Sequence, residues 1–287
     1  MHPLISVNEL KELLQNSSSD KKIHIIDVRS DLRDAEYGRQ SYLEGHVPGA
    51  VFFDVEKDLA TTSNGTNGRH PLPERDDFAA LLGSRGMQSS DHYIVYDDTT
   101  GMFAARLWWM LRWVGCASVQ VLDGGFSAWQ SSGGAEDSVD VPFATAVAWQ
   151  EAPRLVGGRV NVDEVEVNIR LQDFLVIDAR SAARYRGDEE PLDPIAGHIP
   201  GAINRPFSEN LEESGKLKSA EALKSEFSNL LGVRPSSEVV HQCGSGISAC
   251  HNLLAMEVAG LKGAKLYVGS WSEWSSNPNR PVATGNN

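Results

Sequence analysis

The feature that most constrains the fold of this chain is an internal duplication. Within its 287 residues, the passage from Asp98 to Trp129 aligns without a gap with the passage from Cys243 to Trp274, at a constant offset of 145 positions. Glycines coincide in the two passages at 101 and 246, 115 and 260, and 124 and 269. So many matches are hard to attribute to chance. We therefore predict two tandem copies of one domain.

Each copy alternates short apolar runs with helical runs. Strands are predicted at 23–28, 93–96 and 119–122 in the first copy, and at 174–178, 239–242 and 265–268 in the second. Helices are predicted at 103–114 and from 249 to the glycine at 260. The predicted fold class is therefore α/β, each copy a parallel sheet with helices on both faces. We expect the copies to span 1–138 and 159–287, joined by a linker at 139–158.

Composition narrows the range of molecules that this chain is expected to bind. A net charge of −13 argues against nucleic acid or an anionic membrane surface, because both attract basic patches. No apolar run approaches 18 residues and no secretory leader is seen, so we expect a cytoplasmic protein. Three cysteines fit a reducing compartment, with Cys116 and Cys250 expected to pack rather than react. No metal-ligand spacing or nucleotide fingerprint occurs, so no metal or cofactor is predicted.

The duplication also separates structural motifs from chemical ones. Features that both copies share most simply serve the fold, and features found in one copy are candidates for chemistry. On this argument the GlyHisXProGlyAla turns at 45–50 and 197–202 are structural. The same holds for the AspXArg motifs at 27–29 and 178–180, which we expect to be buried tethers. Cys243, by contrast, aligns with Asp98, so only the second copy carries a nucleophile.

The loop after Cys243 suits a reactive thiol. Gly244 and Gly246 let the backbone curl so that successive N–H groups form a concave nest, and a helix follows. Nest and helix terminus both favour a thiolate at Cys243. The alternative is an inert, buried cysteine. A tyrosine-phosphatase loop is disfavoured, because it needs arginine where this chain has Ala249.

These features resemble the two-domain rhodanese-like sulfurtransferases. The resemblance rests on the tandem copies, the paired GlyHisXProGly turns, the ArgTyrXGly segment at 184–187 and the single cysteine loop. It implies an inactive first domain and a second domain in which Cys243 takes sulfur from a small-molecule donor and holds it as a persulfide. The acceptor would then be a small thiol, a thioredoxin-like protein or cyanide.

Within that family the loop indicates the donor. CysGlySerGly followed by Ile247 and Ser248 resembles the 3-mercaptopyruvate class, whereas thiosulfate enzymes carry basic residues after the cysteine. Ser245 and Ser248 could stabilise or protonate the enolate that leaves as pyruvate. For Ser248 the alternative is a helix cap. A thiosulfate sulfurtransferase and a sulfur carrier or regulatory module without turnover remain the alternative functions.

A keto-acid donor needs its carboxylate held, and arginine is best suited. The family's first substrate arginine falls on Arg184, although Arg33 occupies the equivalent place in the first copy, so a structural ion pair is the alternative. The second falls on Leu192, which departs from the pattern. Arg186 or a first-domain residue would have to replace it.

The first copy is longer than the second in the polar segment 61–73. A loop present in one copy, with a titratable group on it, could close over the other copy's site. The resemblance places a functional histidine at His70, within HisProLeuPro, which would relay a proton with Ser245 and an acid at Glu56. The alternatives are a surface histidine and, for Arg69, a solvated loop charge.

Overall fold

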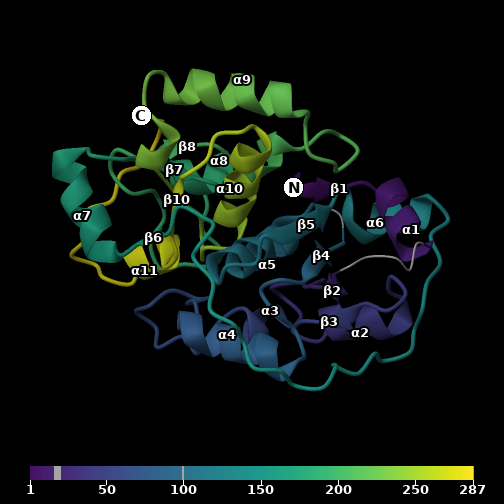
Figure 1. Cartoon of the computed structure of the whole chain (residues 1–287). Coiled ribbons are helices and arrows are strands. Elements are labelled where there is room, and N and C mark those ends of the chain that lie inside the picture. The colour runs from purple at the N-terminus through teal and green to yellow at the C-terminus, as the bar shows by residue number, and fades with distance from the viewer. Residues whose placement is uncertain (16–20, 99, 287) are drawn as a thin grey trace. The chain divides into compact units, whose positions relative to one another are not determined.

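The computed structural model describes residues 1–15, 21–98 and 100–286 and divides into two compact units (Figure 1). Thr99, in the loop that aligns with the cysteine loop, lies outside the described residues. The first unit comprises Met1–Ala60, Pro73–Leu155 and Glu212–Leu217, and the second comprises Thr61–Leu72, Val156–Leu211 and Lys218–Asn287. The extra loop of the first copy is thus part of the second unit.

Each unit contains a five-stranded sheet in which every described pair of neighbouring strands is parallel. In the first unit the order is β1 (Leu4–Ile5), β5 (Ser118–Leu122), β4 (His92–Tyr96), β2 (Ile23–Asp27) and β3 (Val51–Phe52). In the second it is β6 (Arg159–Val160), β10 (Lys265–Tyr267), β9 (Val239–Gln242), β7 (Leu175–Asp178) and β8 (Ile203–Asn204). Counted from the first strand of each copy the two orders are identical. The predicted duplication and α/β class are confirmed.

Helices connect these strands. In the first copy they are α1 (Val7–Gln15), α2 (Tyr37–Glu44), α3 (Val55–Asp58), α4 (Arg75–Ser84), α5 (Met102–Trp113) and α6 (Gly125–Ser131). In the second they are α7 (Val162–Leu171), α8 (Ala182–Arg186), α9 (Ala220–Leu231), α10 (Ser248–Val258) and α11 (Ser270–Trp274), with the 3₁₀ turns η1 (Phe207–Asn210) and η2 (Ser236–Glu238). Gly115 and Gly260 follow α5 and α10 with φ of +102° and +77°, the left-handed conformation that ends a helix.

The histidines of the two GlyHisXProGly turns are structural, as predicted. His46 and His198 are fully buried and stack on Tyr42 and Tyr185, with ring centroids 3.9 and 3.8 Å apart. In each case Nδ1 lies 2.7 Å from the carbonyl oxygen of the same tyrosine. Neither ring is therefore available for chemistry.

The two AspXArg motifs are buried tethers. Arg29 Nη2 lies 2.7 Å from Asp27 Oδ2 and donates to the carbonyl oxygen of Gly45 at 2.6 Å. The same distances recur in the second copy between Arg180, Asp178 and Gly197. The carboxylate at the end of each first strand thus positions an arginine that holds the following turn.

Candidate active site

The candidate nucleophile lies in the loop between β9 and α10. Cys243 directly follows β9, and Ser248 opens the helix. Gly246 adopts φ of +81°, as Gly101 adopts +76° in the first copy. Residues other than glycine disfavour this conformation. This turn brings the Gly246 N–H to Cys243 Sγ, to which it donates a hydrogen bond at 3.1 Å. One amide of the predicted nest therefore faces the sulfur.

The start of α11 holds the cysteine loop in place. The Cys243 N–H donates to Ser270 Oγ at 3.1 Å, and the Cys243 carbonyl accepts from the Trp271 N–H at 2.9 Å. The Gly244 carbonyl accepts from the Ser272 N–H, also at 2.9 Å. The backbone on both sides of Sγ is thus fixed by the second unit's own elements.

Ser270 is a site residue that the sequence analysis missed. It has φ of +55°, whereas the equivalent position in the first copy is Gly125, with φ of +60°. A serine in this conformation is strained, and its hydroxyl bridges the Cys243 N–H and the carbonyl of Tyr267. The signal was available in the sequence, because glycine in one copy and serine in the other is the kind of difference that singled out Cys243.

Cys243 is buried, with 2% of its surface exposed, yet its sulfur has a polar partner. The other cysteines fit the packing roles predicted for them. Cys250 is buried in α10 and its thiol donates to the Gly246 carbonyl at 3.3 Å. Cys116 is buried in the first unit, where desolvation raises the pKa of its thiol to about 12. All three cysteines are free thiols.

The loop 61–72 brings His70 to the cysteine loop within the second unit. His70 Nδ1 lies 2.7 Å from Ser245 Oγ, and both side chains are buried. His70 is therefore not the surface histidine considered as an alternative. Ser248 is half-buried as the first residue of α10, while Ile247 occupies the N-cap position. The helix-cap alternative for Ser248 is therefore wrong.

Arg184 and Arg69 flank the cysteine loop and share a counterion. Arg184 Nη2 donates to Glu190 Oε1 at 2.6 Å and to Asp193 Oδ2 at 3.2 Å. Arg69 Nη1 pairs with Asp193 Oδ1, so Arg69 is not a solvated loop charge. A Cβ placed on Gly244 would lie 2.8 Å from Arg69 Nη2 and 3.3 Å from Arg184 Nη1. Burial raises the pKa of Asp193, which the Arg69 guanidinium opposes.

The remaining predicted residues lie in different settings. Arg33, the counterpart of Arg184, has a side chain 86% exposed and pairs with Asp31 at 3.1 Å, whereas the Arg184 side chain is 16% exposed. Arg186 pairs with Asp188 at 2.6 Å, and Leu192 is exposed. Glu56 is exposed on α3 in the first unit, so it is the one predicted site residue outside the second unit.

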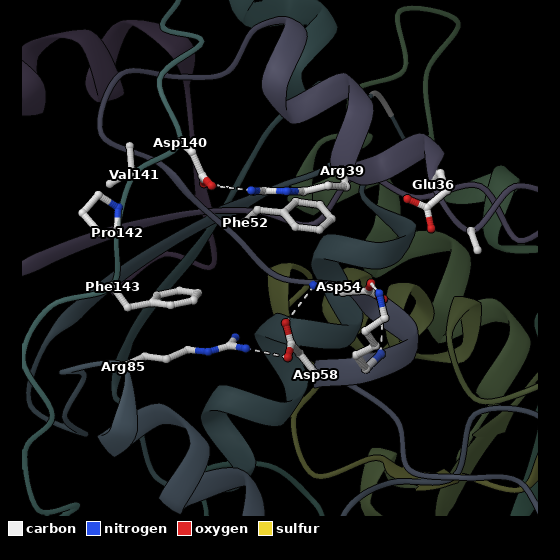
Figure 2. Close-up of a pocket in the computed structure, with 12 residues that line it drawn as sticks. Glu36, Arg39, Phe52, Asp54, Asp58, Arg85, Asp140, Val141, Pro142 and Phe143 are labelled. Carbon is white, nitrogen blue, oxygen red and sulfur yellow. Dashed lines mark hydrogen bonds and ion pairs between the residues drawn. The ribbon is translucent and has the colours of Figure 1, made fainter.

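A cavity of about 480 Å³ lies in the first unit and contains none of the predicted site residues (Figure 2). Its cations are already neutralised. Arg85 lies 2.6 Å from Asp58, and Arg39 pairs with Asp140, as the dashed lines in Figure 2 show. The planar guanidinium of Arg85 also stacks on the Phe143 ring, 4.4 Å from its centroid. These contacts explain the cavity as the junction at which the linker packs on the first unit.

The described residues contain no cluster of three or more histidine, cysteine, aspartate or glutamate residues arranged to hold a metal ion. The helices among residues 1–15, 21–98 and 100–286 are all too short or too polar to span a membrane.

Comparison with known proteins supports the same organisation. The family model described as Rhodanese-like domain matches residues 6–132 and 161–277. A Pseudomonas aeruginosa protein named probable 3-mercaptopyruvate sulfurtransferase is 41% identical, over 93% of this chain and 94% of its own length. The putative thiosulfate sulfurtransferase SseB of Mycobacterium tuberculosis is 38% identical, over 98% of this chain and 97% of its own.

Solved structures agree. The crystal structure of SseA from Escherichia coli, described among 3-mercaptopyruvate sulfotransferases, superposes with a TM-score of 0.78 at 33% identity, covering 94% of this chain and 99% of that one. The family model covers most of the chain, once in each copy, and the relatives match it nearly end to end. This chain therefore belongs to the rhodanese family and carries two rhodanese-like domains.

Proposed function

We propose that this protein is a sulfurtransferase that takes sulfur from 3-mercaptopyruvate, releases pyruvate, and passes the sulfur from a Cys243 persulfide to a thiol or cyanide. The observation that carries the proposal is the Gly246 N–H directed at Cys243 Sγ, at the head of α10. A fixed amide dipole and a helix terminus favour an anionic sulfur, both as thiolate and as persulfide. The names of the relatives support the choice of reaction.

The bonds that form and break in the proposed transfer account for every electron pair and proton. The Cys243 thiolate attacks the sulfur of the donor, an S–S bond forms, and the donor C–S bond breaks. The electron pair of that bond leaves on carbon as the enolate of pyruvate, which takes up one proton. An acceptor thiolate then attacks the outer sulfur and regenerates the Cys243 thiolate.

We assign the proton to the His70–Ser245 pair. A hydroxyl at 2.7 Å from an imidazole nitrogen can donate to the enolate and be reprotonated by the ring. Ser248, at the loop's end, offers a second hydroxyl. The role of Glu56 as the acid behind His70 stays a prediction.

We further infer that Arg184 binds the carboxylate of the donor and that the backbone of Gly244, Gly246 and Ile247 lines the sulfur site. Arg184 is held by Glu190 and Asp193, so its guanidinium is already oriented. A carboxylate accepts two parallel N–H groups from such a fork. Arg186 is a weaker candidate for this role, because its side chain is 34% exposed, against 16% for Arg184.

Intact-mass measurement after incubation with each donor tests the proposal. Addition of one sulfur atom with 3-mercaptopyruvate, its loss on adding a thiol, and stoichiometric pyruvate are expected. The Cys243→Ser variant should fold and gain no sulfur, whereas Cys250→Ser should behave as the unmodified protein. Sulfur transfer by Cys243→Ser would refute the assignment, and charging without discharge would identify a sulfur carrier.

Thiosulfate is the second candidate donor, favoured by the similarity to SseB and by Leu192 at the second arginine position. Initial rates with the two donors at matched concentrations separate the candidates. Activity with thiosulfate alone would overturn the first choice. The free state of all three cysteines supports a reducing, cytoplasmic setting for either reaction.

A further inference from the structure

The loop 61–72 is folded on itself. The Thr61 N–H donates to the Pro71 carbonyl oxygen at 2.9 Å and so joins the two ends of the loop. Near the tip, Ser63 Oγ donates to the Gly68 carbonyl oxygen at 2.7 Å. A loop whose ends are joined and whose tip is bonded internally is expected to dock on its neighbours as one piece. The position of every side chain on it is therefore set by where the loop is held.

The tip of this loop lies against the start of α11. Gly68 adopts φ of +88°, and a Cβ placed on it would lie 2.9 Å from the carbonyl oxygen of Gly269 and 3.1 Å from its Cα. A side chain at position 68 would therefore force the two backbones apart. The next residue, Arg69, donates its backbone N–H to Ser272 Oγ at 3.0 Å. At the tip, docking thus consists of backbone contact and one hydrogen bond, both within the second unit.

Ser272 contacts both loops of the candidate site. Its side chain is buried, and its Oγ donates to the carbonyl oxygen of Gly269 at 3.0 Å. The hydroxyl proton is thereby used, and a lone pair is left to accept the Arg69 N–H. The backbone N–H of Ser272 donates to the carbonyl oxygen of Gly244 at 2.9 Å. One residue of α11 therefore fixes the loop 61–72 through its side chain and the cysteine loop through its backbone.

Arg69 directly precedes His70, so its bond to Ser272 holds the backbone next to the imidazole. That imidazole lies 2.7 Å from Ser245 Oγ, and it can exchange a proton with the hydroxyl only while the two stay within hydrogen-bond distance. We propose that Gly68 and Ser272 are positioning residues, which dock the loop and thereby hold His70 in the relay. The inference rests on the proposed function and extends it to two residues outside the relay itself.

Modification of histidines by diethyl pyrocarbonate, measured by mass spectrometry, tests the docking without turnover. His70 is 5% exposed and is expected to react slowly in the protein without substitutions. Ser272→Ala removes the hydrogen-bond acceptor of the loop, so modification of His70 should become about 3- to 10-fold faster, as expected for the loss of one hydrogen bond. The exposed His2 calibrates the reagent, and the buried His198 reports unfolding of the second unit. The rates at both should stay unchanged.

Two glycines of the loop provide a matched pair of variants. Gly65 has φ of +84°, close to that of Gly68, but a Cβ on it would meet no described atom within 4 Å beyond its neighbours in the chain. Gly65→Ala and Gly68→Ala therefore carry the same backbone strain, and only Gly68→Ala meets Gly269. Faster modification of His70 is expected in Gly68→Ala alone. Equal rates of modification in the two glycine variants, or an unchanged rate in Ser272→Ala, would overturn the docking.

Turnover of 3-mercaptopyruvate tests whether the docking acts through His70. Ser272→Ala should lower kcat about 3- to 10-fold, and it should lower kcat no further in a chain that already carries His70→Gln. Alkylation of Cys243 by iodoacetamide should be unchanged, because Ser272→Ala keeps the backbone bond to the cysteine loop. A changed alkylation rate, or a fall in kcat that persists in the His70→Gln chain, would show that Ser272 acts on the cysteine loop and would overturn the inference. Absence of turnover in the protein without substitutions would overturn the proposed function, while faster modification of His70 in Ser272→Ala would still support the docking.

Discussion

His70 and Ser245 stand 175 positions apart in the sequence, and their hydrogen bond joins two buried side chains of the second unit. If they act as one relay, removing either should remove the whole effect. We expect Ser245→Ala and His70→Gln each to lower kcat with 3-mercaptopyruvate about 10²-fold. The double variant should be no slower than the single ones. Effects on kcat that multiply would show two independent roles.

Ser270 combines a strained backbone with a hydrogen bond to Cys243, so two substitutions separate the contributions. Ser270→Ala keeps the positive φ and loses the bond, and should lower the free energy of unfolding by about 1–2 kcal/mol. Ser270→Gly loses the same bond but relieves the strain, as at Gly125, and should be closer to the unmodified protein. Denaturant unfolding measures both. Equal losses would show that the backbone at 270 is unstrained.

The sequence proposed site residues where it carried a local or duplicated signal, and it did not point to residues placed by distant contacts. Cys243 stood out against Asp98, and His70 lay in a recognisable tetrapeptide. Arg69 gave no such signal, because its environment is set by Asp193, 124 positions away. Ser270 carried a signal that required comparing the copies position by position.

The loops that open α5 and α10 use the same amide in different ways. In the first copy the Gly101 N–H donates to the carboxylate of Asp97 at 2.9 Å. In the second copy the equivalent Gly246 N–H donates to Cys243 Sγ at 3.1 Å. The position of Asp97 is taken there by Gln242, whose buried amide atoms have no hydrogen-bond partner among the described residues. The first copy thus fills its anion site with its own side chain, and the second keeps it for the sulfur.

Introducing the first copy's acid should therefore suppress the nucleophile. In Gln242→Asp a carboxylate competes with Cys243 for the Gly246 N–H. A carboxylate oxygen accepts a stronger hydrogen bond than sulfur does, so we expect the carboxylate to win this competition. We expect alkylation of Cys243 by iodoacetamide to slow about 10-fold. Mass spectrometry of the labelled peptide measures the rate. Gln242→Asn, which adds no charge, should react nearly as the unmodified protein. Equal rates in Gln242→Asp would contradict the competition.

The bounds of helices and strands were predictable to within one or two residues where a glycine ends the element. The strand at 239–242 agrees with β9, and the helix predicted at 103–114 is α5, shifted by one residue at each end. The sequence indicated that the segment 61–73 could close over the second copy's site. It did not indicate that 61–72 is part of the second unit, because the contacts of this segment are with residues far along the chain. The domain limits 1–138 and 159–287 stay a prediction.

Taken as a whole, the molecule contains two units of one topology whose buried acids and bases respond to pH in opposite directions. Burial raises the pKa of Asp97 in the first unit to about 6. The folded unit then keeps a proton that the unfolded chain has released, so its stability falls as the pH rises from about 4 to 6. Burial lowers the pKa of His241 in the second unit to about 3, so that unit loses stability as the pH falls below about 6.5.

His241 should therefore set the acid limit of the second unit. It is fully buried in β9, its Nε2 lies 3.0 Å from Met256 Sδ, and within the described part of the chain its Nδ1 has no hydrogen-bond partner. At pH 5 the unfolded chain is protonated there and the folded one is not, which costs about 2 kcal/mol relative to pH 8. His241→Leu should remove that cost, so its free energy of unfolding should change less between pH 8 and pH 5. Denaturant titrations at both pH values measure the difference between the two free energies of unfolding. Any effect of the substitution on packing is the same at both pH values and cancels in this difference. Asp97→Asn, in the first unit, is the control: its free energy of unfolding should still fall between pH 8 and pH 5, whereas in His241→Leu that fall should be abolished. An acid loss in His241→Leu as large as in the unmodified protein would show that another group is responsible.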